Sequence, residues 1–151
     1  MFKSKGKIIY DPKRNMDKDV KWWCVLEFEK DLDDYLRWVL DREWSKFDAS
    51  TIKRRYHRPP HKSHISIIRG EVPRQNKGSW GDLYRGKTLE FEYDLNISHT
   101  KGFKNEIGEF FFVKATFPEY NKVRAHYGLE TEKDGVPFRG HITFARTYDA
   151  T

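Results

Sequence analysis

A six-residue motif occurs twice in this chain of 151 residues, and it constrains the fold more than any other feature. Residues 64–69 read His-Ile-Ser-Ile-Ile-Arg, and residues 141–146 read His-Ile-Thr-Phe-Ala-Arg. In both, polar and apolar residues alternate over the first four positions, which is typical of a strand with one buried face. The repeat therefore predicts two similar strands, one in each half of the chain.

Each motif closes a similar series of predicted elements. Hydrophobic periodicity and turn residues predict the remaining strands at 7–10, 22–29, 89–97, 110–117 and 138–147, and helices at 31–47 and 119–127. The apolar residues of the first helix, including Tyr35, are expected in the core. The length fits one domain over 1–151. We predict an α+β fold with two strand–strand–helix–loop–strand units.

The two motifs place a histidine beside a hydroxyl residue on the same strand face. Residues two apart in a strand point the same way, so His64 should lie beside Ser66 and His141 beside Thr143. If the two halves pack about a pseudo-dyad, these polar groups face each other across a cleft. The alternative reading, in which both are ordinary core histidines, stays open. In a regular strand the arginine that ends each motif points the other way and caps the strand end.

Two histidines and two hydroxyls suit metal-free cleavage of a phosphodiester bond. Histidine titrates near neutral pH, so one ring can accept a proton from the attacking oxygen while the other protonates the leaving oxygen. Hydroxyl groups can donate hydrogen bonds to the non-bridging phosphate oxygens, where negative charge must be stabilised. The sequence does not tell which histidine is the base.

The surface composition favours an anionic partner. The net charge is +6 and the pI about 9.3, and the basic loop 53–62 precedes the first motif. Arg58 in this loop is a candidate for holding a second phosphate, with a solvated loop as the alternative. Tyr10 and Trp80 are candidates for stacking on nucleotide bases, with ordinary packing as the alternative.

A metal, a cofactor and a membrane segment are not expected. His57 and His61 have a helical spacing, but Pro59 and Pro60 lie between them and no cysteine or carboxylate stands close by. The single cysteine, Cys24, agrees with a reducing compartment and suits the core. No signal-peptide or membrane-spanning stretch is visible, so we expect a cytosolic protein.

The paired histidine–apolar–Ser/Thr–apolar motifs resemble those of the 2H phosphoesterase superfamily. This resemblance implies two pseudo-symmetric antiparallel β lobes with flanking helices around a central cleft. It also implies metal-independent cleavage of nucleotide phosphodiesters, with His64, Ser66, His141 and Thr143 as the catalytic residues.

Three further segments resemble the phage anti-CBASS phosphoesterases, a family that destroys the cyclic oligonucleotide messengers of bacterial antiphage signalling. These segments are 5–12, 22–26 and 56–61. The resemblance implies a cyclic di- or trinucleotide substrate, attack by a ribose 2′-hydroxyl, and hydrolysis of the resulting 2′,3′-cyclic phosphate. It places the protein in the cytoplasm of an infected bacterium, without a stable nucleic-acid complex.

Two other functions remain open at this stage. A related enzyme would act on RNA ends or on mononucleotide 2′,3′-cyclic phosphates, through an open basic groove instead of a closed aromatic pocket. A non-catalytic protein would sequester the messenger. The intact histidine–hydroxyl pairs disfavour sequestration, because binding alone does not require two proton-transfer groups.

Overall fold

The computed structural model describes residues 1–13, 20–47, 59, 63–101 and 109–146. The helices in this part of the chain are α1 (Lys30–Phe47), α2 (Pro118–His126) and the short 3-10 turn η1 (Lys77–Ser79). The strands are β1 (Phe2–Tyr10), β2 (Trp23–Glu27), β3 (His64–Arg69), β4 (Thr88–Tyr93), β5 (Ser98–Lys101), β6 (Glu109–Thr116), β7 (Glu132–Lys133), β8 (Val136–Pro137) and β9 (Gly140–Arg146).

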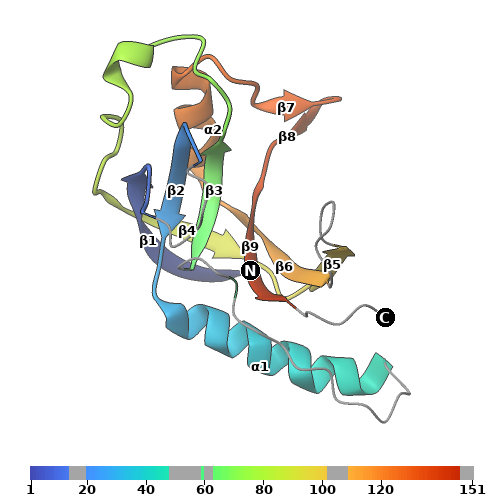
Figure 1. Ribbon diagram of the computed structural model, residues 1–151. Helices are drawn as coiled ribbons and strands as arrows, with labels where there is room; N and C mark the ends of the chain where they lie inside the picture. Colours follow the sequence, from blue (N-terminus) through green and yellow to red (C-terminus); the bar gives the residue numbers. More distant parts are fainter. Residues whose placement is uncertain (14–19, 48–58, 60–62, 102–108, 147–151) are drawn as a thin grey trace.

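An antiparallel sheet with the strand order β4-β1-β2-β3-β9-β6-β5 forms the body of the protein. β4 also pairs with β6, so six of the strands close into a barrel and β5 lies outside it. The short β7–β8 hairpin projects from the sheet (Figure 1). The predicted α+β class is therefore confirmed.

The structure corrects one predicted strand and adds a hairpin that the sequence pattern did not predict. The predicted strand 89–97 is interrupted after Tyr93, because the Asp94 side chain accepts a hydrogen bond from the backbone N–H of Asn96 (3.0 Å) and turns the chain before β5. The β7–β8 hairpin was not predicted at all. Its turn residues Asp134 and Gly135 both have positive φ (54° and 78°), as a tight hairpin requires.

The two helices pack on different strands and share one core. α2 lies against β3 and α1 against β9, and their buried side chains join those of the sheet in a single cluster. α2 ends two residues before the predicted stop signal, Gly128, whose φ is +70°. No helix in the described residues is long and apolar enough to cross a bilayer.

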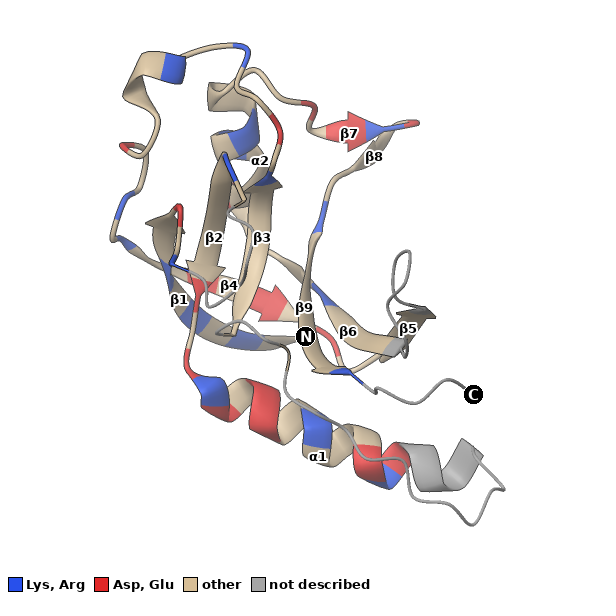
Figure 2. Cartoon of the chain, viewed as in Figure 1, with Lys and Arg blue, Asp and Glu red and all other residues tan. Residues whose placement is uncertain are grey.

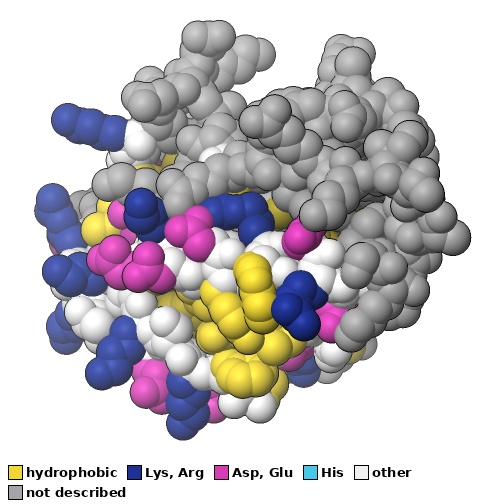
Figure 3. All heavy atoms as spheres, turned by 90° about the horizontal axis from the view of Figure 1, so that it is seen from below, with side chains coloured by type: hydrophobic (Ala, Val, Ile, Leu, Met, Phe, Trp, Pro, Cys, Tyr) yellow, Lys and Arg dark blue, Asp and Glu magenta, His cyan; other side chains and the backbone are white. Residues whose placement is uncertain are grey.

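The outer face of α1 corrects another expectation. Tyr35, expected in the core, is 46% exposed and stacks on Trp38, which is 55% exposed. The guanidinium of Arg42 lies 4.8 Å from the Trp38 ring centroid. Charges of both signs alternate along this helix (Figure 2), and the view from below shows an apolar cluster among charged side chains (Figure 3). Only the inner stripe of α1, including Leu36 and Leu40, is buried.

A glycine allows the two motif strands to come close together. A Cβ atom on Gly140 would collide with the side chain of Ile65 and lie 3.2 Å from the Tyr120 ring. Because glycine lacks that atom, β9 can approach β3 closely at this point. The residue immediately before His141 therefore helps to join the two halves of the repeat.

Candidate active site

The two motif strands are neighbours in the sheet. β3 and β9 run antiparallel with Ile65 opposite Ile142, and both isoleucines are fully buried. Continuing this register by one residue in each direction puts His64 opposite Thr143 and Ser66 opposite His141. The sheet therefore brings all four predicted catalytic residues onto the face opposite to the two isoleucines. The four side chains lie on this face, with His64, Ser66 and Thr143 half-buried and His141 exposed.

The two histidines are diagonal neighbours in this arrangement. Diagonal pairs on one face of an antiparallel sheet are about 7–8 Å apart. That spacing lets a phosphate group sit between His64 and His141, within reach of an acid and a base on opposite sides. The arrangement is therefore compatible with paired proton transfer across one phosphate.

β3 contains a β-bulge in the second half of its motif. Its register with β2 pairs Cys24 with Ile68 and Val25 with Ser66. Ile67 is therefore an extra residue, and the alternation of faces changes after it. As a result Arg69 returns to the face that carries Ser66, instead of pointing away as a regular strand would require.

β9 contains a matching bulge at the equivalent motif position. Its register with β6 pairs Phe111 with Ala145 and Phe112 with Thr143. Phe144, the counterpart of Ile67, is the extra residue here. Arg146, the counterpart of Arg69, therefore lies on the same face as Thr143. The two motifs thus share a bulge at the same position as well as a similar sequence.

Trp23 connects three groups of the first motif. Its indole N–H donates a hydrogen bond to the Ser66 hydroxyl (3.0 Å), and its ring meets His64 edge-on with 5.4 Å between centroids. The Arg69 guanidinium lies 5.6 Å from a Trp23 ring centroid. The Ser66 oxygen thus acts as an acceptor for Trp23, and its hydroxyl proton can be donated to a ligand.

Aromatic rings accompany the second motif in the same way. Phe112 lies beside His141, with 5.3 Å between ring centroids. The guanidinium of Arg146 lies 5.0 Å from the centroid of Phe110, which is its partner across the sheet. Each motif therefore has a histidine beside an aromatic ring and an arginine over one, at comparable distances.

An arginine from each helix binds the carbonyl of a bulged residue. From α2, Arg124 Nη1 donates to the Ile67 carbonyl (2.9 Å), and from α1, Arg37 Nη1 donates to the Phe144 carbonyl (2.7 Å). Arg124 is also held by both carboxylate oxygens of Glu71 (2.7 Å each). Both helices thus satisfy the backbone acceptors that the bulges expose.

The surroundings of His141 lower its pKa below the ordinary value of 6.5. The residue as a whole is exposed, but neighbouring protein atoms reduce the hydration of its ring, which disfavours the charged form. The positive charge of Arg69 acts in the same direction. A lowered pKa keeps His141 neutral, and able to accept a proton, to more acidic pH.

Replacing Arg69 with alanine is expected to raise the pKa of His141. Removing a nearby positive charge favours the protonated imidazole, while the contribution from burial remains, so the pKa should stay below its ordinary value. A titration of the histidine ring signals by NMR measures this shift directly. Arg85→Ala, on the exposed loop before β4, is the matched control. An unchanged His141 titration in the Arg69 variant would show that the charge of Arg69 does not influence the pKa of His141.

The candidate stacking residues lie elsewhere. Ile9 pairs with Val25, which pairs with Ser66, so Ile9 shares the histidine face and Tyr10 points to the opposite one. The Tyr10 hydroxyl donates to the Leu83 carbonyl (2.7 Å), and its ring meets Trp80 at 5.0 Å. The structure therefore does not bring Tyr10 and Trp80 to the histidines, and base stacking by them stays a prediction.

Several other predicted residues have simple outcomes. Arg58, His57 and His61 lie outside the described residues. In the described part of the chain, no group of three His, Cys, Asp or Glu side chains is placed to hold a metal ion. Burial raises the pKa of the Cys24 thiol to about 12, which agrees with a core residue and not a nucleophile.

Sequence reasoning missed Trp23, Phe112 and the orientation of both motif arginines. The orientation of the arginines depends on bulges at Ile67 and Phe144, two apolar residues that no local pattern distinguishes from their neighbours. The one available signal was the arginine at the end of both motifs.

The chain matches no protein-family model, no curated protein and no solved structure.

Proposed function

We propose that this protein is a metal-independent phosphodiesterase that cleaves cyclic di- or trinucleotide messengers. The observation that carries the proposal is the β3–β9 register, which sets His64, Ser66, His141 and Thr143 on one face. Two proton-transfer groups at diagonal positions, each beside a hydroxyl, are what phosphodiester cleavage requires and what binding alone does not.

In the first step, His141 accepts the proton of a ribose 2′-hydroxyl, and its lowered pKa suits it to this role. The 2′-oxygen then forms a bond to phosphorus while the bond from phosphorus to the 5′-oxygen breaks. His64 gives a proton to that leaving oxygen. The products are an opened chain with a 2′,3′-cyclic phosphate at one end and a 5′-hydroxyl at the other.

In the second step, water opens the cyclic phosphate with the two roles exchanged. His64, now neutral, accepts a proton from water as the water oxygen bonds to phosphorus. The bond to the 2′-oxygen breaks, and His141 returns a proton to it, leaving a 3′-phosphate. The enzyme ends with the protons distributed as at the start, so no co-reactant other than water is consumed.

The neighbouring groups would stabilise the charge on phosphorus. Ser66 accepts from Trp23 and can give its own proton to a non-bridging oxygen. Arg69 and Arg146, turned by the bulges, carry positive charge to either side of the histidines. A guanidinium held over an aromatic ring is ordered before the ligand arrives, which reduces the entropy lost on binding.

The doubled arrangement of β2–β3 with α2 and β6–β9 with α1 supports a 2H phosphoesterase-like fold with two related lobes. If the protein has the role of the anti-CBASS phosphoesterases, it would act in the cytoplasm of an infected bacterium and let a phage evade CBASS immunity. The substrate would be a small cyclic oligonucleotide, and neither a metal nor a cofactor would be needed.

Chromatography of a 3′,5′-linked cyclic dinucleotide after incubation with the protein and excess EDTA tests the proposal. We expect linear products that end in a 3′-phosphate with the wild type, and unchanged substrate with His141→Ala. Intact substrate in both samples would redirect attention to RNA ends and mononucleotide 2′,3′-cyclic phosphates, and then to sequestration. Cleavage that EDTA abolishes would contradict the metal-independent mechanism.

A further inference from the structure

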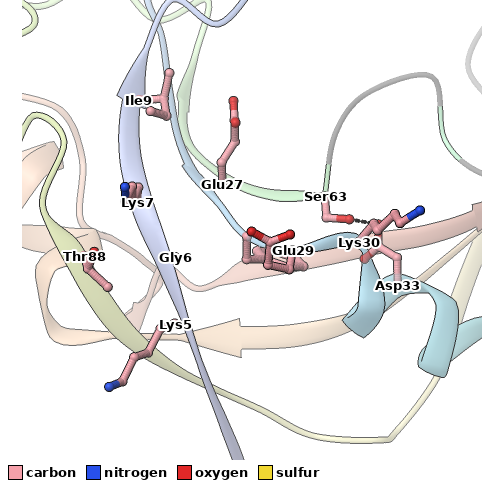
Figure 4. A pocket seen from close by; sticks show the side chains of 11 residues that line it. Lys5, Gly6, Lys7, Ile9, Glu27, Glu29, Lys30, Asp33, Ser63 and Thr88 are labelled. Carbon is pink, nitrogen blue, oxygen red and sulfur yellow. Dashed lines mark hydrogen bonds between the residues drawn. The ribbon is translucent and has the colours of Figure 1, made fainter.

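A cavity of about 590 Å³ opens beside the candidate active site. Its volume lies within the range of about 300–1,000 Å³ that small-molecule sites occupy. It is formed by the β1 and β4 strands on one side, and by the end of β2, the start of α1 and the residue before β3 on the other (Figure 4).

The cavity and the histidines share one face of the sheet. Across the strands, Thr88 of β4 pairs with Lys7 of β1, Lys7 pairs with Glu27 of β2, and Glu27 pairs with His64 of β3. Directly paired residues of an antiparallel sheet point to the same side. Thr88, Lys7 and Glu27 all line the cavity, so its lining reaches the residue that is paired with His64 on the neighbouring strand.

The two sides of the cavity carry different groups. Lys5 and Lys7 project from β1, and the exposed ammonium groups of this side can bind a phosphate. On the opposite side (Figure 4), Glu27 and Glu29 offer carboxylates that accept hydrogen bonds from hydroxyls and amines, and Lys30 adds one further ammonium group. A nucleotide matches this division, with an anionic phosphate at one end and ribose hydroxyls and base amines at the other.

A buried hydrogen bond closes the end of the cavity nearest His64. Asp33 of α1 is 2% exposed and accepts a hydrogen bond from the Ser63 hydroxyl (2.6 Å), itself 6% exposed. This bond joins the start of α1 to the residue immediately before His64. The end of the cavity nearest the histidine is therefore fixed in place before any ligand binds, which favours a specific site.

We propose that this cavity binds the second nucleotide unit of the substrate, the one that does not carry the scissile phosphate. The inference rests on the proposed function and assigns a place on the protein to the part of the substrate that is not cleaved. Lys7 lies two strands from His64, a separation of about 10 Å. A mononucleotide held between the histidines leaves this cavity empty, whereas a cyclic dinucleotide extends into it.

Binding of a cyclic dinucleotide to a non-turnover protein tests this inference. In the His141→Ala background, we expect the double change Lys5→Ala and Lys7→Ala to raise the Kd measured by calorimetry about tenfold, because charge-assisted hydrogen bonds to the phosphate are lost. Lys133→Ala, on the exposed β7–β8 hairpin, makes the same kind of charge change away from the cavity and should leave the Kd unchanged.

A mononucleotide 2′,3′-cyclic phosphate supplies the second readout. With both histidines present, the double change should lower kcat/KM for the cyclic dinucleotide much more than for the mononucleotide. Equal reductions for both substrates, or an unchanged Kd for the dinucleotide, would overturn the assignment of the cavity. Absence of turnover by the wild type would instead overturn the proposed function, so the two failures are distinguishable.

Discussion

Replacing either His64 or His141 with alanine is expected to reduce kcat/KM for a cyclic dinucleotide by about 10²–10⁴-fold. This is the range over which a positioned acid or base contributes to proton transfer. The two residues act on the same reaction from opposite sides, so the double variant should lose little more than either single one. Steady-state kinetics with purified variants measures all three values.

The stability of these variants should change little. His141 is exposed and His64 only half-buried, so truncation removes few core contacts. We expect the thermal midpoint to stay close to that of the wild type. His99→Ala, on the exposed strand β5, is the matched control for losing an imidazole and should keep full activity. Near-normal kcat/KM in either motif variant would contradict the paired mechanism.

Replacing Arg124 with methionine is expected to reduce the free energy of unfolding by about 2–4 kcal/mol. Arg124 is 5% exposed and donates to the carbonyls of Ile67 (2.9 Å) and Glu130 (2.7 Å). Methionine keeps much of the apolar stem but leaves the buried Ile67 carbonyl without this donor, which costs about 1–3 kcal/mol, and also removes the bonds to Glu71 and to the more exposed Glu130. Urea unfolding measures the loss.

Two further variants separate the contributions within this cluster. Glu71→Gln should cost less than Arg124→Met, because the Glu71 side chain is 43% exposed and solvent screens its ion pair. Lys122→Ala, exposed on the same helix, should have little effect. Faster amide exchange over 67–69 in Arg124→Met would show that the bulge itself loosens, and an unfolding free energy equal to the wild type would contradict its role.

The effect of Glu71 should depend on pH in a defined direction. The hydrogen bonds from Arg124 hold the pKa of the Glu71 carboxyl below its ordinary value of 4.5. A lowered carboxyl pKa means that the stabilisation is fully present above pH 4.5 and is lost as the pH falls through the lowered value. The difference between wild type and Glu71→Gln should therefore shrink below that pH.

Local pattern was enough to predict most elements of the fold. Alternation predicts the motif strands, helical periodicity predicts the first helix, and the stop signal Gly128 predicts the end of the second, and all three are properties of short stretches. The same pattern assigned His64 and Ser66 to one face, because neighbouring residues fix the direction of a side chain in a regular strand. Local pattern was wrong for Tyr35, which was expected in the core but is exposed. It was also wrong for the strand predicted at 89–97, which is interrupted after Tyr93 by a turn that the Asp94 side chain stabilises.

By itself, then, the sequence determined the α+β class and the two histidine–hydroxyl strands. Tertiary structure alone decided that these strands are antiparallel neighbours, that Ile67 and Phe144 bulge, and that Arg69 and Arg146 turn to the histidine face. The cavity beside His64 also exists only because three strands, α1 and the residue before β3 meet there. Strand order and bulges depend on pairing between residues far apart in the chain, and such pairing leaves no periodic trace in either partner.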